Sequence, residues 1–401
     1  MPPPADGPAA VAAGGRVPMK RYWEIDALRG LMLVLMTFTH LPTRFTDPLG
    51  QPFGFVSAAE GFVLLSAFVA GLVYTRISDR QGVDAMRRAF WRRALKVYLA
   101  QAATLLFLFT IITRVGLRID QPAVKNLLSF YLADPPEAFA YSLLLVYEPA
   151  LLDILPMYIF FMLMSPWVLA FALRHGWAGV MLASAAFWAL AQFGFSEWLY
   201  GLAAQYLHLS VPFHEMGAFN AFAWQFLWFA GLWMGASRHA PDAEPFRIPR
   251  WVAALAVALA IYGIWWRHHG INGQAPFGGD EELNMLFDKW QLGPLRIVNL
   301  VVLGIVAVRF GPGLMRRIPR LRWLEAMGSA SLPVFCAHLV AVLLVLAFYG
   351  DSQTARPWWG DALLLAVVFA WLYAVARATQ WWDNRPPKAR YRDTGTIDSS
   401  A

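Results

Sequence analysis

Long apolar stretches alternate with short polar loops along nearly the whole chain. A helix needs about 17–25 consecutive, mostly apolar residues to cross a bilayer. A weakly apolar run at 126–147 is either an eleventh span or a re-entrant element. The remaining pattern predicts ten spanning helices, near residues 26–42, 53–75, 89–113, 152–173, 176–194, 219–237, 251–267, 293–309, 329–349 and 360–380.

The composition indicates the same class of protein. Of 401 residues, 58% are hydrophobic and 15% are charged, whereas soluble domains carry about 25% charged residues. We therefore expect an all-α, polytopic helical bundle with a single membrane-embedded domain over residues 21–384. Residues 1–20 are rich in Pro, Ala and Gly and lack a basic stretch followed by an apolar run, so we expect a disordered tail rather than a signal peptide. Residues 385–401 are expected to form a cytoplasmic tail.

The formal net charge of +7 is unevenly distributed. With ten spans, the basic loops all fall on one side of the membrane, and the positive-inside rule makes that side cytoplasmic. Both termini are then cytoplasmic, and the loops on the opposite side are acidic and aromatic. This sidedness explains the basic excess without a nucleic-acid partner. The single cysteine, Cys336, excludes an internal disulfide.

The first predicted helix carries three ionisable residues, Asp26, Arg29 and His40. At about 100° per residue, Arg29 and His40 differ by only about 20° around the helix, and they lie about 16 Å apart along its axis. Asp26 lies within about 60° of both. Such residues are costly inside a membrane and are usually functional. A neutral imidazole suits removal of a hydroxyl proton near pH 7, so we interpret His40 as a general base near the outer surface.

The second predicted helix carries Glu60 about 10 Å below its outer end, a depth similar to that of His40. Glu60 is therefore a candidate to orient His40 and to stabilise its positive charge. The alternative is a structural ion pair with Arg29 or another basic residue. Ser57 lies one turn away, where it caps the helix or lines the site.

Several basic residues are candidates for binding anionic groups. Arg88, Arg92 and Arg93 begin the third helix on the cytoplasmic side, where they suit a polyphosphate, although positive-inside bias alone predicts such a cluster. Lys289 and Arg296 flank the start of the eighth helix on the outer side. Because that bias does not require basic residues there, they are the better candidates for an anionic ligand.

Two further polar side chains lie within predicted spans. His338 lies in the middle of the ninth helix and is either structural or functional. Gln225 of the sixth helix either contacts substrate or joins helices by hydrogen bonds. No metal site is expected, because His268 and His269 are adjacent and no other ligand stands at a suitable spacing.

Six stretches in this order resemble the OpgC family of membrane glucan succinyltransferases over nearly the whole chain. The spacing from Arg29 to His40 also resembles the wider acyltransferase-3 type of membrane enzyme, in which a histidine of the first helix is taken as catalytic. The six stretches are EIDALRGLMLVLMTFTHLP (24–42), FVSAAEGFVLLSAFVAGLVY (55–74), LPMYIFFMLMSPWVL (155–169), FNAFAWQFLWFAG (219–231), DKWQLGPLRIVNL (288–300) and MGSASLPVFCAHL (327–339).

The resemblance implies a multi-pass enzyme of the bacterial inner membrane. It would transfer a succinyl group from cytoplasmic succinyl-CoA to glucose hydroxyls of osmoregulated periplasmic glucans. Succinyl-CoA is then a co-substrate, and no tightly bound cofactor is implied. The catalytic histidine of the family corresponds to His40, the glutamate of the second helix to Glu60, and the arginine pair of the third helix to Arg88 and Arg93. The cytoplasmic arginines would hold the CoA phosphates, and Arg29 or another donor would stabilise the oxyanion.

Two alternatives stay open. The first is an O-acetyltransferase acting on another cell-surface polysaccharide. The second is a proton-coupled transporter or flippase that uses Asp26, His40 and Glu60 as a relay. Direct acyl transfer and an acyl-histidine intermediate are both compatible with the sequence. The sequence predicts no oligomeric state.

Overall fold

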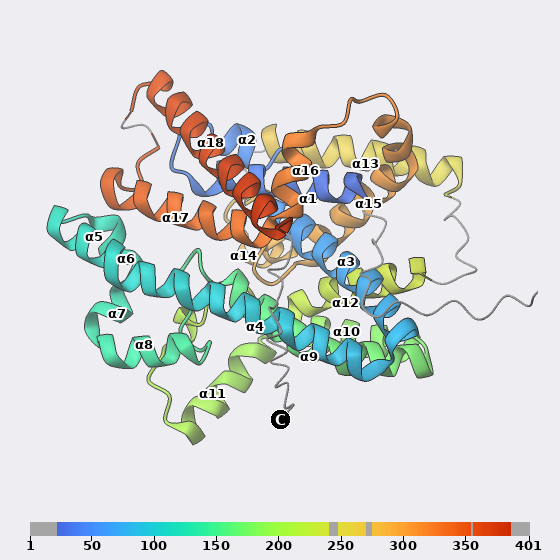
Figure 1. Ribbon diagram of the computed structural model, residues 1–401, viewed down its shortest axis with the longest axis horizontal. Helices are drawn as coiled ribbons and strands as arrows, with labels where there is room; N and C mark the ends of the chain where they lie inside the picture. The colour runs from blue at the N-terminus through green and yellow to red at the C-terminus, as the bar shows by residue number, and fades with distance from the viewer. Residues whose placement is uncertain (1–21, 240–247, 270–274, 354–355, 386–401) are drawn as a thin grey trace, which may run out of the picture.

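The computed structural model describes residues 22–239, 248–269, 275–353 and 356–385, and all regular secondary structure in this part of the chain is helical (Figure 1). Most of the two predicted tails lies outside the described residues. A helix occupies each of the ten predicted positions. These helices are α1 (Trp23–His40), α3 (Ala58–Gln81), α4 (Val83–Phe107), α9 (Ile154–His175), α10 (Ala178–Ala191), α12 (Ala221–His239), α13 (Arg250–His269), α15 (Pro294–Met315), α17 (Ser331–Tyr349) and α18 (Trp358–Asp383).

Shorter helices connect the long ones. A π-helical turn, η1 (Leu108–Ile112), continues α4 into α5. Two 3₁₀ turns, η2 (Phe213–Glu215) and η3 (Met285–Phe287), precede α12 and α15. The remaining short helices are α2 (Thr46–Gly50), α5 (Thr113–Ile119), α6 (Pro122–Leu127), α7 (Ser129–Ala133), α8 (Pro135–Leu143), α11 (Phe195–Leu207), α14 (Glu281–Asn284) and α16 (Arg322–Ser329).

Seven of the described helices are long and apolar enough to cross a membrane. They are α3, α4 continued to Ile119, α9, α13, α15, α17 and α18. The count becomes eight if α10 and α11, which are bent by 80°, form one broken span. The chain is therefore a multi-pass membrane protein. Helix α1 has the required length but carries Glu24, Asp26 and Arg29, so its composition alone does not mark it as a span.

The run at 126–147 does not form a spanning helix. It is divided among α6, α7 and α8, which have six, five and nine residues. A helix that crosses a bilayer needs about 20 residues. Helices α5 and α6 pack against α17, so this segment covers the side of the bundle near the end of α17.

Glycines bring the central helices into close contact. A Cβ atom at Gly71 would lie 2.2 Å from the Leu232 carbonyl oxygen, and one at Gly235 would lie 2.0 Å from the Phe68 carbonyl oxygen. Gly231 and Gly235 are four residues apart on α12, the small-residue spacing that favours close helix packing in membranes. The α3–α12 contact is the most extensive between any two elements of the described chain.

Candidate active site

A cavity of about 690 Å³ lies where the end of α1 meets the start of α3. The other lining residues come from segments around residues 150–154, 218–219 and 281–290, the end of α13 and the first turns of α15 and α17. Four residues expected from the sequence lie in this lining, namely His40, Ser57, Lys289 and Arg296. The structure therefore brings together candidates that are separated by more than 200 positions in the chain.

His40 contacts a second histidine. Its Nδ1 atom lies 3.1 Å from Nε2 of His338, and the two rings are stacked with their centroids 5.1 Å apart. His338 lies on α17 and is fully buried. One of the two nitrogens must donate the proton of this hydrogen bond, so the tautomers of the two histidines depend on each other. The sequence identified both histidines, but their spacing in the chain does not predict this contact.

A buried carboxylate anchors the segment that follows His40. Both oxygens of Asp361, in the first turn of α18, accept hydrogen bonds, one from Nε of Arg356 at 2.8 Å and the other from Nε of Arg44 at 3.2 Å. Arg356 also donates to the Pro42 carbonyl oxygen. These contacts attach the chain after α1 to the start of α18 and so hold the end of α1 that carries His40. Sequence analysis did not identify this carboxylate.

Glu60 is paired with Arg296. Its Oε1 atom lies 2.9 Å from Arg296 Nε, and both side chains are almost completely buried. Its other oxygen accepts hydrogen bonds from the Ser57 backbone and hydroxyl, which forms a capping box at the start of α3. Arg296 also donates to the Phe55 carbonyl oxygen at 2.5 Å. Of the two roles considered for Glu60, the structure shows the ion pair with a basic residue, in place of a direct contact with His40.

Two other cations line the cavity. The Lys289 ammonium lies 4.3 Å from the centroid of the Trp290 ring and 5.7 Å from that of Phe219, and burial lowers the pKa of Lys289. Arg267, at the end of α13, is the second cation. Sequence analysis missed Arg267, although the argument that selected Lys289 applies to it, because positive-inside bias does not require an arginine at the outer end of a helix.

Acidic groups lie beside these cations. Asp153 lines the cavity and accepts a hydrogen bond from the Ala218 backbone at 3.0 Å. Burial raises the pKa of Asp153, and it raises the pKa of neighbouring Glu148 well above its ordinary value, with the Asp153 charge adding to the effect. The acids and Lys289 together make this wall of the cavity sensitive to pH.

Other predicted site residues lie elsewhere. Arg29 donates to the Ser331 hydroxyl at 2.5 Å and lies 4.0 Å from Asp26. Because this group lies at the start of α1 and His40 is its last residue, they are about 16 Å apart along the helix. Gln225 bonds both to the Ser184 hydroxyl at 2.6 Å and to the Ser184 carbonyl at 2.8 Å. Gln225 therefore joins α12 to α10, which is the structural one of the two roles that the sequence left open for it.

The arginines of α4 form a separate basic surface. Arg88 and Arg92 are exposed and one helical turn apart, and Arg93 is partly buried. They do not line the large cavity. In the described residues, no group of three or more His, Cys, Asp or Glu side chains is arranged to hold a metal ion. The cavity can therefore supply imidazole acid–base chemistry and cationic binding groups from the residues described.

Comparison with known proteins gives one match. The family described as OpgC protein matches residues 21–384, which is most of the chain. No curated protein and no solved structure matches the chain.

Proposed function

Because the chain belongs to the OpgC family, we propose that it transfers a succinyl group from succinyl-CoA to a glucose hydroxyl of an osmoregulated periplasmic glucan. Family membership indicates an acyltransferase-type activity on glucans. The succinyl donor and the catalytic base are our proposal. The observation that carries it is the His40–His338 pair, because His40 lies in the lining of a cavity that also contains Lys289, Arg267 and Arg296.

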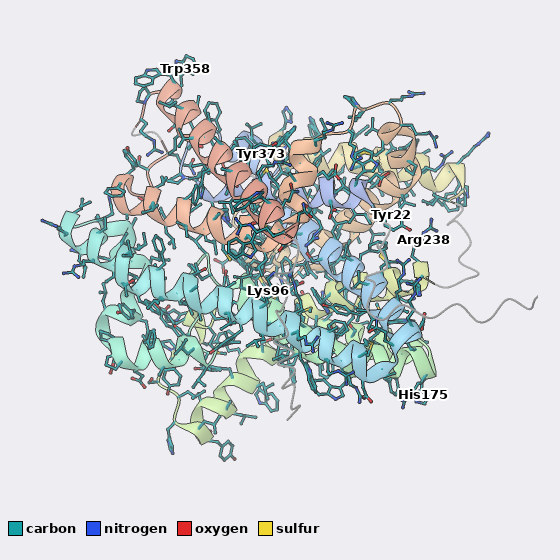
Figure 2. The ribbon with its side chains drawn as sticks, in the orientation of Figure 1. Tyr22, Lys96, His175, Arg238, Trp358 and Tyr373 are labelled. Carbon is teal, nitrogen blue, oxygen red and sulfur yellow. The ribbon has the colours of Figure 1, made fainter. Side chains whose placement is uncertain are left out.

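The proposed topology has ten spans with both termini in the cytoplasm of the bacterial inner membrane. Figure 2 shows Tyr22, His175 and Arg238 on the right of the molecule and Trp358 at its upper left. The first three residues lie at helix ends that this topology makes cytoplasmic, whereas Trp358 begins α18 on the outer side. Their separation supports this topology, in which His40, at the outer end of α1, would lie on the periplasmic side.

The reaction follows from the histidine pair. If His40 donates its Nδ1 proton to His338, its Nε2 is left without a proton and can accept one. Nε2 then takes the proton from a glucose hydroxyl while the hydroxyl oxygen forms a bond to the thioester carbon. The carbon–sulfur bond breaks, and the CoA thiolate receives the proton from His40. His338 would fix the tautomer and share the positive charge, which is one of the two roles that the sequence left open for Glu60.

Two groups of cations would bind opposite ends of succinyl-CoA, its succinyl carboxylate and its CoA phosphates. A succinyl group has a distal carboxylate, which a buried site must match with a cation. Lys289 and Arg267 fit this role, because Arg296 already has Glu60 as its counter-ion. Arg88, Arg92 and Arg93 would hold the CoA phosphates on the cytoplasmic side.

The test uses purified protein with succinyl-CoA and a glucan. We expect acyl transfer that depends on the glucan, and His40→Ala should lower it by about 10²- to 10⁴-fold, the usual contribution of general-base catalysis. A folded His40→Ala protein with full activity would remove His40 as the base. A transporter would move its ligand unchanged, so an absence of glucan-dependent CoA release would contradict the acyltransferase itself.

Donor selectivity is tested separately. Lys289→Ala and Arg267→Ala should reduce transfer from succinyl-CoA more than transfer from acetyl-CoA, because only the succinyl group carries the distal carboxylate. Gln51→Ala, in the same cavity lining, is the uncharged control. Equal losses with both donors would mean that these cations hold the structure or the sugar.

A further inference from the structure

A second cavity, of about 380 Å³, adjoins the large one at His40. Thr39, His40 and Leu151 line both cavities. The other lining residues of the small cavity come from the segment after α1, from α2 and α6, and from the end of α17 and the residues after it. His40 is therefore accessible from two separate spaces.

The two cavities differ in charge. The lining of the small cavity contains Asp351 and neutral hydrogen-bonding side chains, including Thr46, Asn126 and Gln353, and no lysine or arginine is among its lining residues. The large cavity is lined by three such cations, Arg267, Lys289 and Arg296, and also by the carboxylates of Asp153, Glu281 and Asp288. An anionic group would therefore find cationic partners in the large cavity and none among the lining residues of the small one.

We propose that the small cavity holds a glucose unit of the acceptor glucan while the large cavity holds the acyl end of the donor. This inference rests on the proposed function, because it assigns the two substrates of that reaction to two spaces. Each substrate then approaches the same imidazole from its own side.

The lining of the small cavity matches a neutral saccharide. The side chains of Asn126 and Gln353 are exposed, so their amides can donate to and accept from sugar hydroxyls. Leu127 and Leu346 add apolar surface for the C–H face of a glucose ring. Exposure at Asn126 and Gln353 also leaves room for the rest of a long glucan to extend into solvent.

With one substrate in each cavity, every bond and proton of the transfer step is accounted for. A glucose hydroxyl in the small cavity gives its proton to His40, and its oxygen bonds to the acyl carbon presented from the large cavity. The carbon–sulfur bond of the donor breaks, and the released thiolate takes the proton. Neither substrate must leave its cavity before the ester has formed.

The experiment measures protection from thiol labelling. Two matched glutamines, Gln353 in the small cavity and Gln51 in the large cavity, are replaced singly by cysteine in full-length protein that also carries Cys336→Ser. Maleimide labelling rates are then compared with no ligand, with a neutral glucose oligosaccharide, and with succinyl-CoA. We expect the oligosaccharide to slow labelling of Gln353→Cys at least several-fold and to leave Gln51→Cys unchanged. Succinyl-CoA should give the reverse pattern.

The outcomes separate this inference from the proposed function. Protection of Gln353→Cys by succinyl-CoA instead of the oligosaccharide, or by phospholipid alone, would overturn the assignment. A glucan-dependent transferase in which neither substrate protects Gln353→Cys would also overturn it, with the proposed function intact. Protection by the oligosaccharide in a protein that transfers no acyl group would support a saccharide site and contradict the transferase.

Discussion

At the scale of single residues, two pairs of ionisable side chains distinguish the site, the partly buried His40–His338 pair and the buried Glu60–Arg296 pair. Sequence spacing identified His40 and Glu60 as the ionisable groups near the outer ends of two neighbouring helices. Their partners, His338 and Arg296, lie on helices almost 300 and more than 200 positions later, and the periodicity of one helix carries no information about such distant contacts. For the same reason Asp361, buried at the start of the last helix, was not predicted from sequence.

The role of His338 predicts a graded response to substitution. His338→Ala should lower kcat for acyl transfer more than it changes KM, because it removes the hydrogen-bond partner of the His40 ring. His338→Gln keeps a hydrogen-bond acceptor and should recover part of kcat. Steady-state kinetics on purified, folded variants would measure both. Equal kcat values for the two variants would mean that His338 only fills space.

The ion pair of Glu60 and Arg296 predicts a loss of stability. Glu60→Gln leaves a buried guanidinium without its counter-ion, which typically costs about 3–5 kcal/mol. The double variant Glu60→Gln with Arg296→Met removes both charges and should recover much of that loss. Thermal unfolding in detergent would compare the variants. A Glu60→Gln protein that is as stable as the wild type but inactive would favour the catalytic alternative for Glu60 that the sequence left open.

The acids near Lys289 predict a pH dependence of stability. Because folding raises the pKa of Glu148 and of Asp153, the folded state binds protons more tightly than the unfolded state. The contribution of these two acids to the free energy of unfolding is therefore fully present at pH values below their pKa values in the unfolded chain. It is lost as the pH rises through their pKa values in the folded protein. Glu148→Gln should raise Tm at pH 8 and change it little at pH 4. An equal change at both pH values would contradict this explanation.

Close helix packing dominates at the scale of elements. The apolar periodicity located all ten long helices, but it does not specify which of them are neighbours. The spacing of Gly231 and Gly235 indicates one close contact on α12, and the structure identifies α3 as its partner. The bend between α10 and α11 and the division of 126–147 into short helices depend on tertiary contacts that hydropathy alone does not encode.

Gly235 and Gly304 provide a matched test of this packing. An alanine Cβ at Gly235 would lie 2.0 Å from a carbonyl oxygen of α3, whereas one at Gly304 would have no atom within 4 Å. Gly235→Ala should therefore lower Tm, because the helices must separate. Gly304→Ala should leave Tm unchanged or raise it slightly, since alanine favours the helix by up to about 1 kcal/mol. Similar Tm values for the two variants would show that α3 and α12 can move apart at little cost in stability.

At the scale of the whole molecule, the main question is which side of the membrane each loop faces. The basic loops and the ten helices together favour cytoplasmic termini, and the cavity around His40 then faces the periplasm. The sequence predicted the class of fold because a helix that crosses a membrane needs a long run of apolar residues, and such runs are visible in the sequence. It selected four residues that line the cavity, and it could not predict the cavity itself, which forms only when distant loops meet.

Reporter fusions would test this orientation. A fusion after His175, between α9 and α10, should report the cytoplasm, and a fusion after Asp351, between α17 and α18, should report the periplasm. A fusion at Asn284 should agree with the one at Asp351. The reversed pattern would put His40 on the cytoplasmic side and reverse the direction of transfer.

The attachment of the chain after α1 to Asp361 has a consequence for biosynthesis. The helix that ends at His40 leaves the ribosome long before α18, which brings the carboxylate that holds the next segment with Arg44 and Arg356 as donors. A nascent or truncated chain that lacks α18 therefore has its imidazole but not the anchor for the segment behind it. Such a chain would remain a poor catalyst until α18 is inserted.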